Sequence, residues 1–312
     1  MKRALVAGGS GFIGSHLCEK LIEKGYSVAC VDNLKSGKKS NLKNIINNKN
    51  FRFIKADIRK FTKINGNLDF VCNLASYASP PYYQKYSVDT LMTNSLGAFN
   101  MLELARKKKA RYLTTSTSEV YGNPLKHPQK ETYWGNVNPV GIRSCYDEAK
   151  RFAESLIMEY VRKHKLDARI IRVFNTYGPR LQKDDGRVIS NFIHQSLTGK
   201  PVTIYGKGSQ TRSFCYISDL VAGITAVMEK PGLRGEVINL GNPREFTVKE
   251  AAKIIKKITN SRSKIIYKPL PGDDPERRKP DVSKAKRLLN WKAKTGLREG
   301  LGRTIEWFKN GP

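Results

Sequence analysis

Cysteine and histidine are scarce in this sequence, and their spacing argues against both a disulfide framework and a dedicated metal site. The chain of 312 residues contains five cysteines, an odd number with no close pair, and four histidines. A disulfide framework needs paired cysteines, and a dedicated metal site needs clustered ligands such as Cys-x-x-Cys or His-Glu-x-x-His. Neither pattern occurs, so we expect no disulfide scaffold and no bound metal.

Long apolar runs are also missing. A membrane-spanning helix needs about 20 consecutive apolar residues, and no segment of the chain approaches that length. The first predicted strand begins at Arg3, which leaves no room for a signal peptide ahead of the fold. We therefore expect no membrane segment and a cytoplasmic location.

Acidic side chains are few, because 27 Asp and Glu residues stand against 57 Lys and Arg residues, for a formal net charge of +30. Such a charge attracts polyanions. The basic residues, however, are spread along the chain in short clusters such as 38–39, 106–109 and 277–279, with no basic tail. This distribution favours a lysine-rich solvated surface over nucleic acid binding, and small phosphorylated ligands would gain from the same charge.

Apolar runs of strand length alternate with segments of helical periodicity through the first half of the chain. The predicted strands cover residues 3–7, 28–31, 51–56, 70–74, 111–115 and 168–173, and the predicted helices cover 12–21, 88–107 and 146–163. Strands that alternate with helices indicate an α/β fold built on a parallel, doubly wound sheet of the Rossmann type.

The alternation loosens after about Asn175, where proline and glycine become more frequent. Residues 178–186 and 269–280 are typical of long loops, while short elements are predicted at 188–197, 202–205, 220–228, 248–258 and 297–309. We expect a dinucleotide-binding domain over residues 1–175 and a smaller C-terminal substrate-binding lobe, mainly over 176–312, with some segments that return to the sheet.

Three glycines follow the first predicted strand. Gly8, Gly11 and Gly14 form the pattern G-x-x-G-x-x-G at a helix start, where bare backbone N–H groups and the helix dipole can meet a pyrophosphate. Asp32 ends the second strand, 18 residues after Gly14, where its carboxylate can accept hydrogen bonds from an adenosine ribose and repel a 2′-phosphate. The pattern predicts NAD rather than NADP, although three lysines follow within residues 35–39.

Tyr146 and Lys150 stand four residues apart in a predicted helix, so their side chains share one helical face. Tyrosine ordinarily has a pKa of about 10, and a neighbouring ammonium together with a nicotinamide cation favours the phenolate that a proton acceptor needs. Lys150 is also placed to bind the nicotinamide ribose. Thr117 lies in a hydroxyl-rich segment, where sequence order places it to hold a substrate hydroxyl beside Tyr146. This set predicts hydride transfer.

Longer motifs along the chain carry a family resemblance. They are Gly8–Gly14, Leu74–Pro81, Ser116–Gly122, Glu131–Pro139, Phe174–Arg180, Asp185–Val188, Gly208–Phe214 and Arg278–Asp281. With these motifs the sequence resembles the extended short-chain dehydrogenase/reductase superfamily and, within it, the UDP-glucuronic acid decarboxylases. The first motif is common to the superfamily, whereas Glu131–Pro139 and Gly208–Phe214 are far more particular, and the resemblance covers nearly the whole chain.

The resemblance implies a redox-neutral conversion of UDP-glucuronate to UDP-xylose. Tyr146 would remove the proton of the sugar 4-hydroxyl while NAD takes the C4 hydride, and the resulting 4-keto acid loses carbon dioxide readily. Tyr146 and Thr117 are the candidate donors to the enolate oxygen, and the hydride then returns, so the cofactor is regenerated. Glu119 and Arg212 are the implied decarboxylase signature, flanking and orienting the sugar carboxylate, with Ser118 beside Glu119.

A cofactor site and a UDP-sugar site follow from the motifs and this resemblance. The cofactor set is Gly8, Gly11, Phe12, Ile13, Gly14, Asp32, Asn33, Asp57, Ile58, Leu74, Ser76, Thr93, Tyr146 and Lys150. The UDP-sugar set is Tyr82, Asn175, Arg187, Val188, Tyr205, Gln210, Arg212 and Arg278. A ring for stacking, amides for base and ribose and guanidinium groups for phosphate suit such a ligand.

The chain departs from the family pattern at Met92, where a substrate-contacting lysine is usual, and at Lys207 and Ser218, where acidic residues are common. Met92 puts one phosphate or carboxylate contact in question. Lys207 and Ser218 account for part of the high positive charge.

Other functions stay open from the sequence. A related decarboxylase stops at the UDP-4-keto-pentose and releases NADH, and nothing local excludes this outcome. Glu119 and Arg212 speak against an epimerase or dehydratase, and intact Tyr146, Lys150 and Thr117 against an idle NAD-binding or nucleic acid-binding protein. The helices predicted at 88–107 and 146–163 suit a four-helix homodimer contact, as the resemblance implies.

Overall fold

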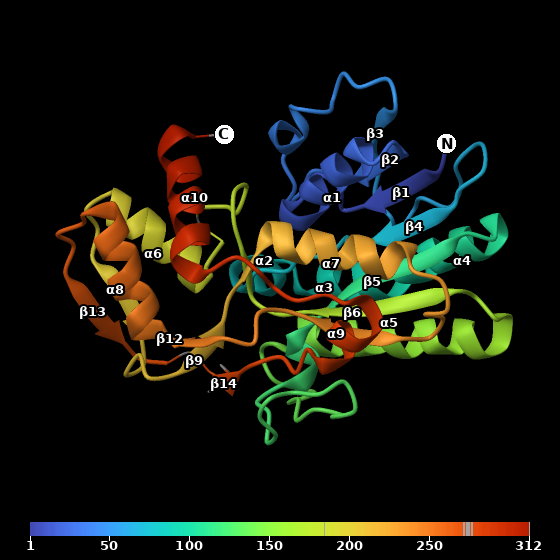
Figure 1. The fold of residues 1–312 in the computed structure, drawn as a ribbon. Coiled ribbons are helices and arrows are strands. Elements are labelled where there is room, and N and C mark those ends of the chain that lie inside the picture. Colours follow the sequence, from blue (N-terminus) through green and yellow to red (C-terminus); the bar gives the residue numbers. More distant parts are fainter. Residues whose placement is uncertain (184, 271, 273–274, 276, 312) are drawn as a thin grey trace.

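A parallel sheet forms the centre of the computed structural model, which describes residues 1–183, 185–270, 272, 275 and 277–311 (Figure 1). Among these residues the strand order is β11-β6-β5-β4-β1-β2-β3, and each neighbouring pair is parallel. The strands are β1 (Arg3–Ala7), β2 (Ser27–Asp32), β3 (Phe51–Lys55), β4 (Phe70–Asn73), β5 (Arg111–Thr117), β6 (Ala168–Val173) and β11 (Val237–Leu240). The predicted α/β fold class is confirmed.

Helices cover both faces of this sheet. On one face lie α1 (Phe12–Glu23) and α7 (Ile217–Glu229), and on the other α4 (Ala98–Lys108) and α5 (Ser144–His164). Successive side chains of a strand point to opposite faces, and β1 is apolar at both. Its Ala4 and Val6 join the core with α1 and α7, whereas Leu5 and Ala7 join the core with α4 and α5.

The helix predicted over residues 88–107 is divided in the structure. It consists of α3 (Ser87–Met92), the π-helical segment η2 (Thr93–Gly97) and α4, and it follows the short helix α2 (Pro80–Lys85). All of these elements contact α5 or one another. Thr93, at the start of η2, is thereby brought to the edge of the sheet where a ligand is expected.

The smaller lobe lies beside the sheet, on the left in Figure 1. It contains α6 (Val188–Leu197), α8 (Val248–Thr259), α10 (Leu297–Asn310), and the parallel pair β8 (Val202–Tyr205) and β13 (Ile265–Lys268). Thr247 and Glu250 form a reciprocal capping box that starts α8. Another small sheet joins β9 (Thr211–Ser213) to β12 (Glu245–Thr247) and β14 (Arg277–Arg278).

Segments of the second half of the chain also return to the large sheet. Besides β11 and α7, the helix α9 (Ser283–Leu289) contacts β11. Outside the large sheet, β7 (Thr176–Tyr177) and β10 (Cys215–Tyr216) form a two-stranded parallel sheet of their own. Single 3-10 turns are η1 (Lys39–Leu42) and η3 (Ser118–Tyr121). The loop predicted at 269–280 falls partly outside the described residues and otherwise includes β14.

Each of the five cysteines, all within the described part of the chain, is a buried thiol with no disulfide partner. Within the same residues, no group of three or more His, Cys, Asp or Glu side chains is placed to hold a metal ion. No helix of the described chain has both the length and the apolar character that crossing a membrane requires.

Candidate functional site

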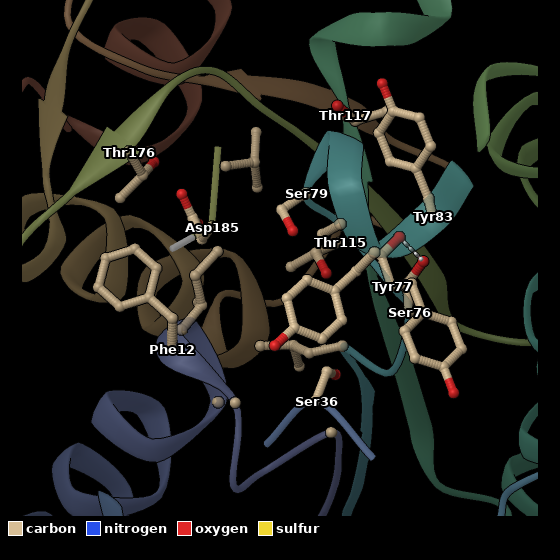
Figure 2. A pocket seen from close by; sticks show the side chains of 18 of the residues that line it. Phe12, Ser36, Ser76, Tyr77, Ser79, Tyr83, Thr115, Thr117, Thr176 and Asp185 are labelled. Carbon is tan, nitrogen blue, oxygen red and sulfur yellow. Dashed lines mark hydrogen bonds between the residues drawn. The ribbon is translucent and has the colours of Figure 1, made fainter. Parts of the chain in front are cut away.

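A cavity of about 360 Å³ opens where β1, β2, β4, β5 and β6 end. The carboxyl ends of parallel strands meet at one edge of a sheet, and ligands of doubly wound folds bind there. Figure 2 shows Phe12, Thr176 and Asp185 on the left of this cavity and Ser76 and Tyr83 on the right, with Ser79 between the two groups. The cavity therefore lies between the large sheet and the segments that lead into the lobe.

The glycine motif forms a tight turn at one wall of this cavity. Gly8 has a φ of +76°, and a Cβ added there would lie 2.7 Å from the backbone nitrogen of Ala75. A Cβ on Gly14 would lie 2.1 Å from the carbonyl oxygen of Gly8. The absent side chains thus let α1 start against β1, and the first N–H groups of α1 face the cavity as a cradle that fits a pyrophosphate.

Asp32 stands beside this cradle at the end of β2. Its Oδ2 accepts from the backbone N–H of Ser10 at 3.0 Å and its Oδ1 from that of Leu34 at 2.8 Å. Burial raises the pKa of Asp32, while these backbone N–H groups act in the opposite direction. The carboxylate is held in the cavity wall, where it suits a ribose diol and not a phosphate.

Beside Asp32, the cavity is also lined by Asn33, Asp57 and Ile58. Asn33 donates to Asp57 at 3.3 Å, and Arg59 donates to both oxygens of Asp57. Hydrogen bonds from Arg59 lower the pKa of Asp57 to about 2. This part of the cavity offers a fixed carboxylate and an apolar side chain, which suits a purine ring.

Tyr146 and Lys150 lie side by side on the first turns of α5, both buried and both in the cavity wall. The Nζ of Lys150 donates to the carbonyl oxygen of Thr115 at 2.9 Å and lies 5.9 Å from the centre of the Tyr146 ring. The ring of Tyr146 stacks on that of Tyr83 at 5.0 Å with 5° between their planes. The tyrosine is therefore held in one orientation.

Burial dominates the ionisation of this pair. It raises the pKa of Tyr146 to about 12, although a hydrogen bond with the Thr117 hydroxyl opposes the shift. Burial also lowers the pKa of Lys150 to about 8. The sequence led us to expect that Lys150 would favour the phenolate, but in the protein alone the lost hydration outweighs that attraction because both groups are enclosed.

Thr117 and Ser118 close the cavity at the end of β5. The Oγ1 of Thr117 accepts from the backbone N–H of Glu119 at 3.2 Å and so caps η3. The same hydroxyl can donate its proton, and it hydrogen-bonds Tyr146. Ser118 is buried next to it and also lines the cavity.

Glu119 is enclosed by guanidinium groups. Arg278 donates to both of its oxygens, with 2.9 Å between Nη2 and Oε2, and Arg143 donates to Oε2 at 2.5 Å. Burial alone would raise the pKa of Glu119, but Arg278 and Arg143 outweigh it and hold that pKa below its usual range. Burial and the negative charge of Glu119 raise the pKa of Asp147.

The resemblance named Glu119 and Arg212 together as the residues that flank and orient the sugar carboxylate, and the structure brings both into the cavity wall. Arg143, which the sequence analysis did not name, and Arg278, which it assigned to the UDP, hydrogen-bond Glu119. Arg212 donates to the carbonyl oxygen of Thr211 at 2.8 Å and lies opposite Arg278 in the β9–β14 register.

Most of the residues that the sequence singled out line this one cavity. They are Gly8, Gly11, Phe12, Ile13, Gly14, Asp32, Asn33, Asp57, Ile58, Leu74, Ser76, Tyr82, Thr93, Thr117, Ser118, Glu119, Tyr146, Lys150, Asn175, Arg187, Val188, Arg212 and Arg278. In the wall that the described residues form, Tyr205 and Gln210 are not included. They contact each other, with the Gln210 amide donating to the Tyr205 carbonyl oxygen at 2.6 Å.

Comparison with known proteins identifies the family. Residues 4–241 match the model of the NAD dependent epimerase/dehydratase family. The chain belongs to this family. Membership confirms the predicted dependence on NAD, and the glycine cradle with Asp32 fits that cofactor.

Two relatives of this family resemble almost the whole chain. UDP-glucuronic acid decarboxylase 1 of Arabidopsis thaliana is 52% identical and covers 99% of this chain and 70% of its own length. UDP-glucuronic acid decarboxylase 1 of Danio rerio is 48% identical and covers 98% of this chain and 72% of its own length. These relatives confirm the resemblance that the motifs indicated.

Solved structures of the family share the fold. The UDP-glucuronic acid 4-epimerase of Bacillus cereus, in complex with UDP-glucuronic acid and NAD, has a TM-score of 0.91 at 28% identity and covers 99% of both chains. The UDP-glucose 4-epimerase of Thermotoga maritima, with UDP-glucose, has a TM-score of 0.90 at 34% identity and also covers 99% of both chains.

Arg143 and Tyr83 are among the cavity residues that the sequence analysis did not single out, although a signal existed for one of them. Arg143 precedes Tyr146 by three residues, so a helix that begins there presents both on one face. Tyr83 follows Tyr82 in a short helix, and periodicity gives no means to choose between them. The structure buries Tyr83 against Tyr146 and leaves Tyr82 partly exposed.

The close contact at Gly14 yields the first prediction. Gly14→Ala places a methyl group against the Gly8 carbonyl oxygen, so the turn must open and the cradle must deform. We expect NAD binding, measured by calorimetry, to weaken by at least about tenfold and the melting temperature to fall. Gly302→Ala in α10 is the control, because no atom lies within 4 Å of its added Cβ. It should bind NAD as the wild type does, and its melting temperature should not fall, because alanine favours a helix interior over glycine. Unchanged affinity in Gly14→Ala would contradict the assigned role of the turn.

Burial of Lys150 predicts a pH dependence of stability. Its pKa is about 8 in the folded protein and 10.5 unperturbed, so between these values the unfolded chain binds more protons. The free energy of unfolding should therefore rise with pH across this window, by up to about 1.4 kcal/mol per pH unit from this residue. Urea unfolding of the cofactor-free protein from about pH 8 to 10 should show a smaller rise in Lys150→Met than in the wild type.

The exposed Lys253 of α8 provides the control for this measurement. Lys253→Met should keep the slope of the wild type, because the Lys253 side chain is exposed in the folded protein. Equal slopes for the wild type and Lys150→Met would show that Lys150 is not enclosed as described.

Proposed function

We propose that this protein is a UDP-glucuronate decarboxylase that forms UDP-xylose in an NAD-dependent, redox-neutral reaction through a UDP-4-keto intermediate. The observation that carries the proposal is one cavity that contains the dinucleotide cradle, the Tyr146–Lys150 pair and Glu119 between two arginines. Similarity to UDP-glucuronic acid decarboxylases over almost the whole chain supports it.

The cofactor is proposed to lie between the glycine turn and Asp57. Gly8, Gly11 and Gly14 would meet its pyrophosphate, Asp32 the adenosine ribose, and Asp57 with Ile58 the adenine. The remaining members of this proposed set are Phe12, Ile13, Asn33, Leu74, Ser76, Thr93, Tyr146 and Lys150. When bound, NAD supplies reversible two-electron oxidation of the sugar at C4.

Tyr146 is proposed to accept the proton of the sugar 4-hydroxyl. The raised pKa of Tyr146 in the protein alone makes the phenol a poor base. Neighbouring cations must therefore lower that pKa when the ligands occupy the cavity and exclude water. Lys150 is fixed by Thr115 and supplies one such charge. Thr117 donates its hydroxyl proton to the substrate oxygen, and it stabilises the enolate that decarboxylation leaves.

The Glu119 cluster is proposed to handle the sugar carboxylate, with Ser118 at its side. Arg143 and Arg278 attract an anion, whereas Glu119 repels it and occupies the guanidinium groups. Decarboxylation requires negative charge to leave the carboxylate and move to the ketone oxygen, and an arginine pair alone would stabilise the ground state. Glu119 thus keeps the attraction sufficient for binding without opposing the loss of carbon dioxide.

The UDP moiety is proposed to extend toward the lobe. Asn175, Arg187, Val188 and Arg212 line this part of the cavity and, with Tyr82, offer amide, guanidinium and ring contacts. Tyr205 and Gln210 belong to the proposed uracil end, beyond the described wall. In this division residues 1–175 mainly hold NAD and residues 176–312 mainly hold the UDP-sugar.

The test is a single incubation of the purified protein with UDP-glucuronate and a catalytic amount of NAD. Carbon dioxide, NADH absorbance and the nucleotide-sugar product, by mass spectrometry, are followed together. We expect carbon dioxide and a UDP-pentose with no lasting NADH. Stoichiometric NADH with a UDP-4-keto-pentose would indicate a decarboxylase that stops midway, a UDP-hexuronate product would indicate an epimerase, and no turnover would refute the proposal.

Two variants separate the proposed roles in this assay. Tyr146→Phe should lose at least about 1,000-fold in kcat and still bind NAD. Glu119→Gln removes the repulsion, so kcat should fall by about 100-fold while KM for UDP-glucuronate does not rise and NAD affinity is unchanged. Tyr267→Phe and Glu306→Gln, both at exposed positions, are the matched controls. Retained turnover in Tyr146→Phe would remove its role as the base.

A homodimer is proposed as the assembly, together with a cytoplasmic location. Val88, Leu91, Leu96, Phe99 and Phe152 are exposed apolar side chains on α3, η2, α4 and α5, and these elements pack together. A second copy of the same face would bury them in a four-helix contact.

The face defined by these side chains predicts the effect of a charge. Phe99→Asp should shift the protein from dimer to monomer in analytical ultracentrifugation, because a desolvated carboxylate without a partner is costly in an interface. Ile266→Asp on β13, where the apolar side chain is also exposed, should leave the dimer intact. A wild type that sediments as a monomer, or a dimeric Phe99→Asp, would contradict this assembly.

A further inference from the structure

Residues 178–182, here called the strap, cross from the sheet to the elements around the glycine turn. The carbonyl oxygen of Pro179 lies 3.0 Å from Nε2 of His16 on α1. The amide of Gln182 donates to the carbonyl oxygen of Ser36, which lies after β2, at 2.5 Å. Leu181 is buried in the core that includes α1 and the lobe. The strap is thus tied on both sides of the cradle.

Arg180 occupies the middle of the strap in an unusual backbone conformation. Its φ of +69° is in the left-handed region, which costs about 1 kcal/mol or more for a residue with a side chain. The surrounding contacts impose this conformation. Nη2 of Arg180 binds Oε1 of Glu19 on α1 at 2.6 Å, and Asn44 holds the same oxygen at 3.0 Å.

The second terminal nitrogen of this guanidinium is unsatisfied in the described chain. Nη1 of Arg180 is buried and has no hydrogen-bond partner among the described residues, and the side chain of Arg180 is 12% exposed. Arg180 also belongs to the wall of the cavity, together with Gly11 and Phe12. A buried charged donor without an acceptor is costly, and an anion in the cavity that reached Nη1 would remove that cost.

The positive charge of Arg180 also acts on the neighbouring His16. Burial first and the charge of Arg180 next lower the pKa of His16 to about 4, so His16 is neutral at physiological pH and donates from Nε2 to Pro179. The ring of His16 lies edge-on to that of Phe12 at 6.0 Å, within the first turns of α1. Figure 2 shows Thr176 and Asp185, which flank the strap in sequence, on the same side of the cavity as Phe12.

We propose that Arg180 is a positioning residue that holds the pyrophosphate of NAD from the strap side, opposite the glycine turn. The proposal rests on the proposed NAD site. Glu19 and Asn44 fix one arm of the guanidinium, and the free arm meets the phosphate charge. The strap, anchored at His16 and Ser36, then retains the cofactor in both oxidation states, because the pyrophosphate does not change when the nicotinamide is reduced.

Retention has a chemical consequence for the proposed reaction. The oxidised sugar is reduced again only if the same NADH stays in place while carbon dioxide leaves. A loosened strap lets NADH escape after the first half of the reaction, and the product is then a UDP-4-keto-pentose. Arg180 therefore favours the redox-neutral outcome over release.

The test measures cofactor release without any substrate. Protein loaded with NADH is mixed with excess NAD in a stopped-flow instrument, and the fall in NADH fluorescence gives the dissociation rate. We expect Arg180→Ala to release NADH at least about tenfold faster, and its Kd for NAD to rise by a similar factor. Arg180→Lys keeps the charge but loses the fork, so its rate should lie between those of Arg180→Ala and the wild type.

Two further variants separate positioning from structure. Glu19→Gln removes the anchor of Arg180 and should also speed release, which keeps the proposal testable if Arg180→Ala does not fold. Arg303→Ala breaks the Arg303–Glu299 pair of α10, at 2.8 Å, and should leave the rate unchanged.

Release rates within twofold of the wild type in folded Arg180→Ala, or in folded Glu19→Gln if the former does not fold, would overturn the proposal, whatever the melting temperature. A wild type that binds no NADH would overturn it together with the proposed cofactor site. A wild type that retains NADH but does not decarboxylate UDP-glucuronate would refute the proposed function alone, and the rate comparison would still decide the role of Arg180.

Discussion

The pairing of Glu119 with Arg278 is the interaction on which the geometry of the site depends. Glu119 follows β5 in the large sheet, and Arg278 comes from the small sheet of the lobe, 159 positions later. Breaking one partner of a buried pair leaves a charge without compensation, which is strongly destabilising. The pair therefore fixes the lobe against the sheet at the point where the two halves of the cavity meet, and Arg143 extends it to the start of the helix that carries Tyr146.

Much of the fold and the wall of the cavity around the glycine turn could be predicted from the sequence, because both depend on local signals. The apolar residues Ala4–Ala7 of β1, the glycines that follow them and Asp32 at the end of β2 lie within 32 residues. The wall around Glu119 could not be predicted to the same depth. Strands such as β9 and β14 have two or three residues, too few for a period, and partners of Glu119 come from distant segments. The roles expected of Arg212 and Arg278 came from the family resemblance and not from a local signal in the sequence.

Electrostatics could be predicted in kind and not in magnitude. The four-residue spacing of Tyr146 and Lys150 correctly predicts that they share a helical face. The spacing does not show how deeply that face is buried from solvent. The structure encloses both, so burial raises the pKa of Tyr146 and lowers that of Lys150. Both shifts favour the neutral forms. With a pKa of about 12, Tyr146 is a neutral phenol before ligands bind. Charges that ligands bring into the cavity act on that pKa, which links the ionisation of Tyr146 to occupancy of the cavity.

The late position of Arg278 in the chain has a consequence for assembly during synthesis. Chains fold from the N-terminus as they emerge, and the glycine turn, Asp32, Tyr146 and the strap are all made before residue 183. The lobe-side clamp on Glu119 arrives only with β14, close to the end of the chain. A nascent protein can thus contain the glycine turn, Asp32 and Tyr146 while Glu119 still lacks Arg278, and the wall around Glu119 is complete only when β14 has been made.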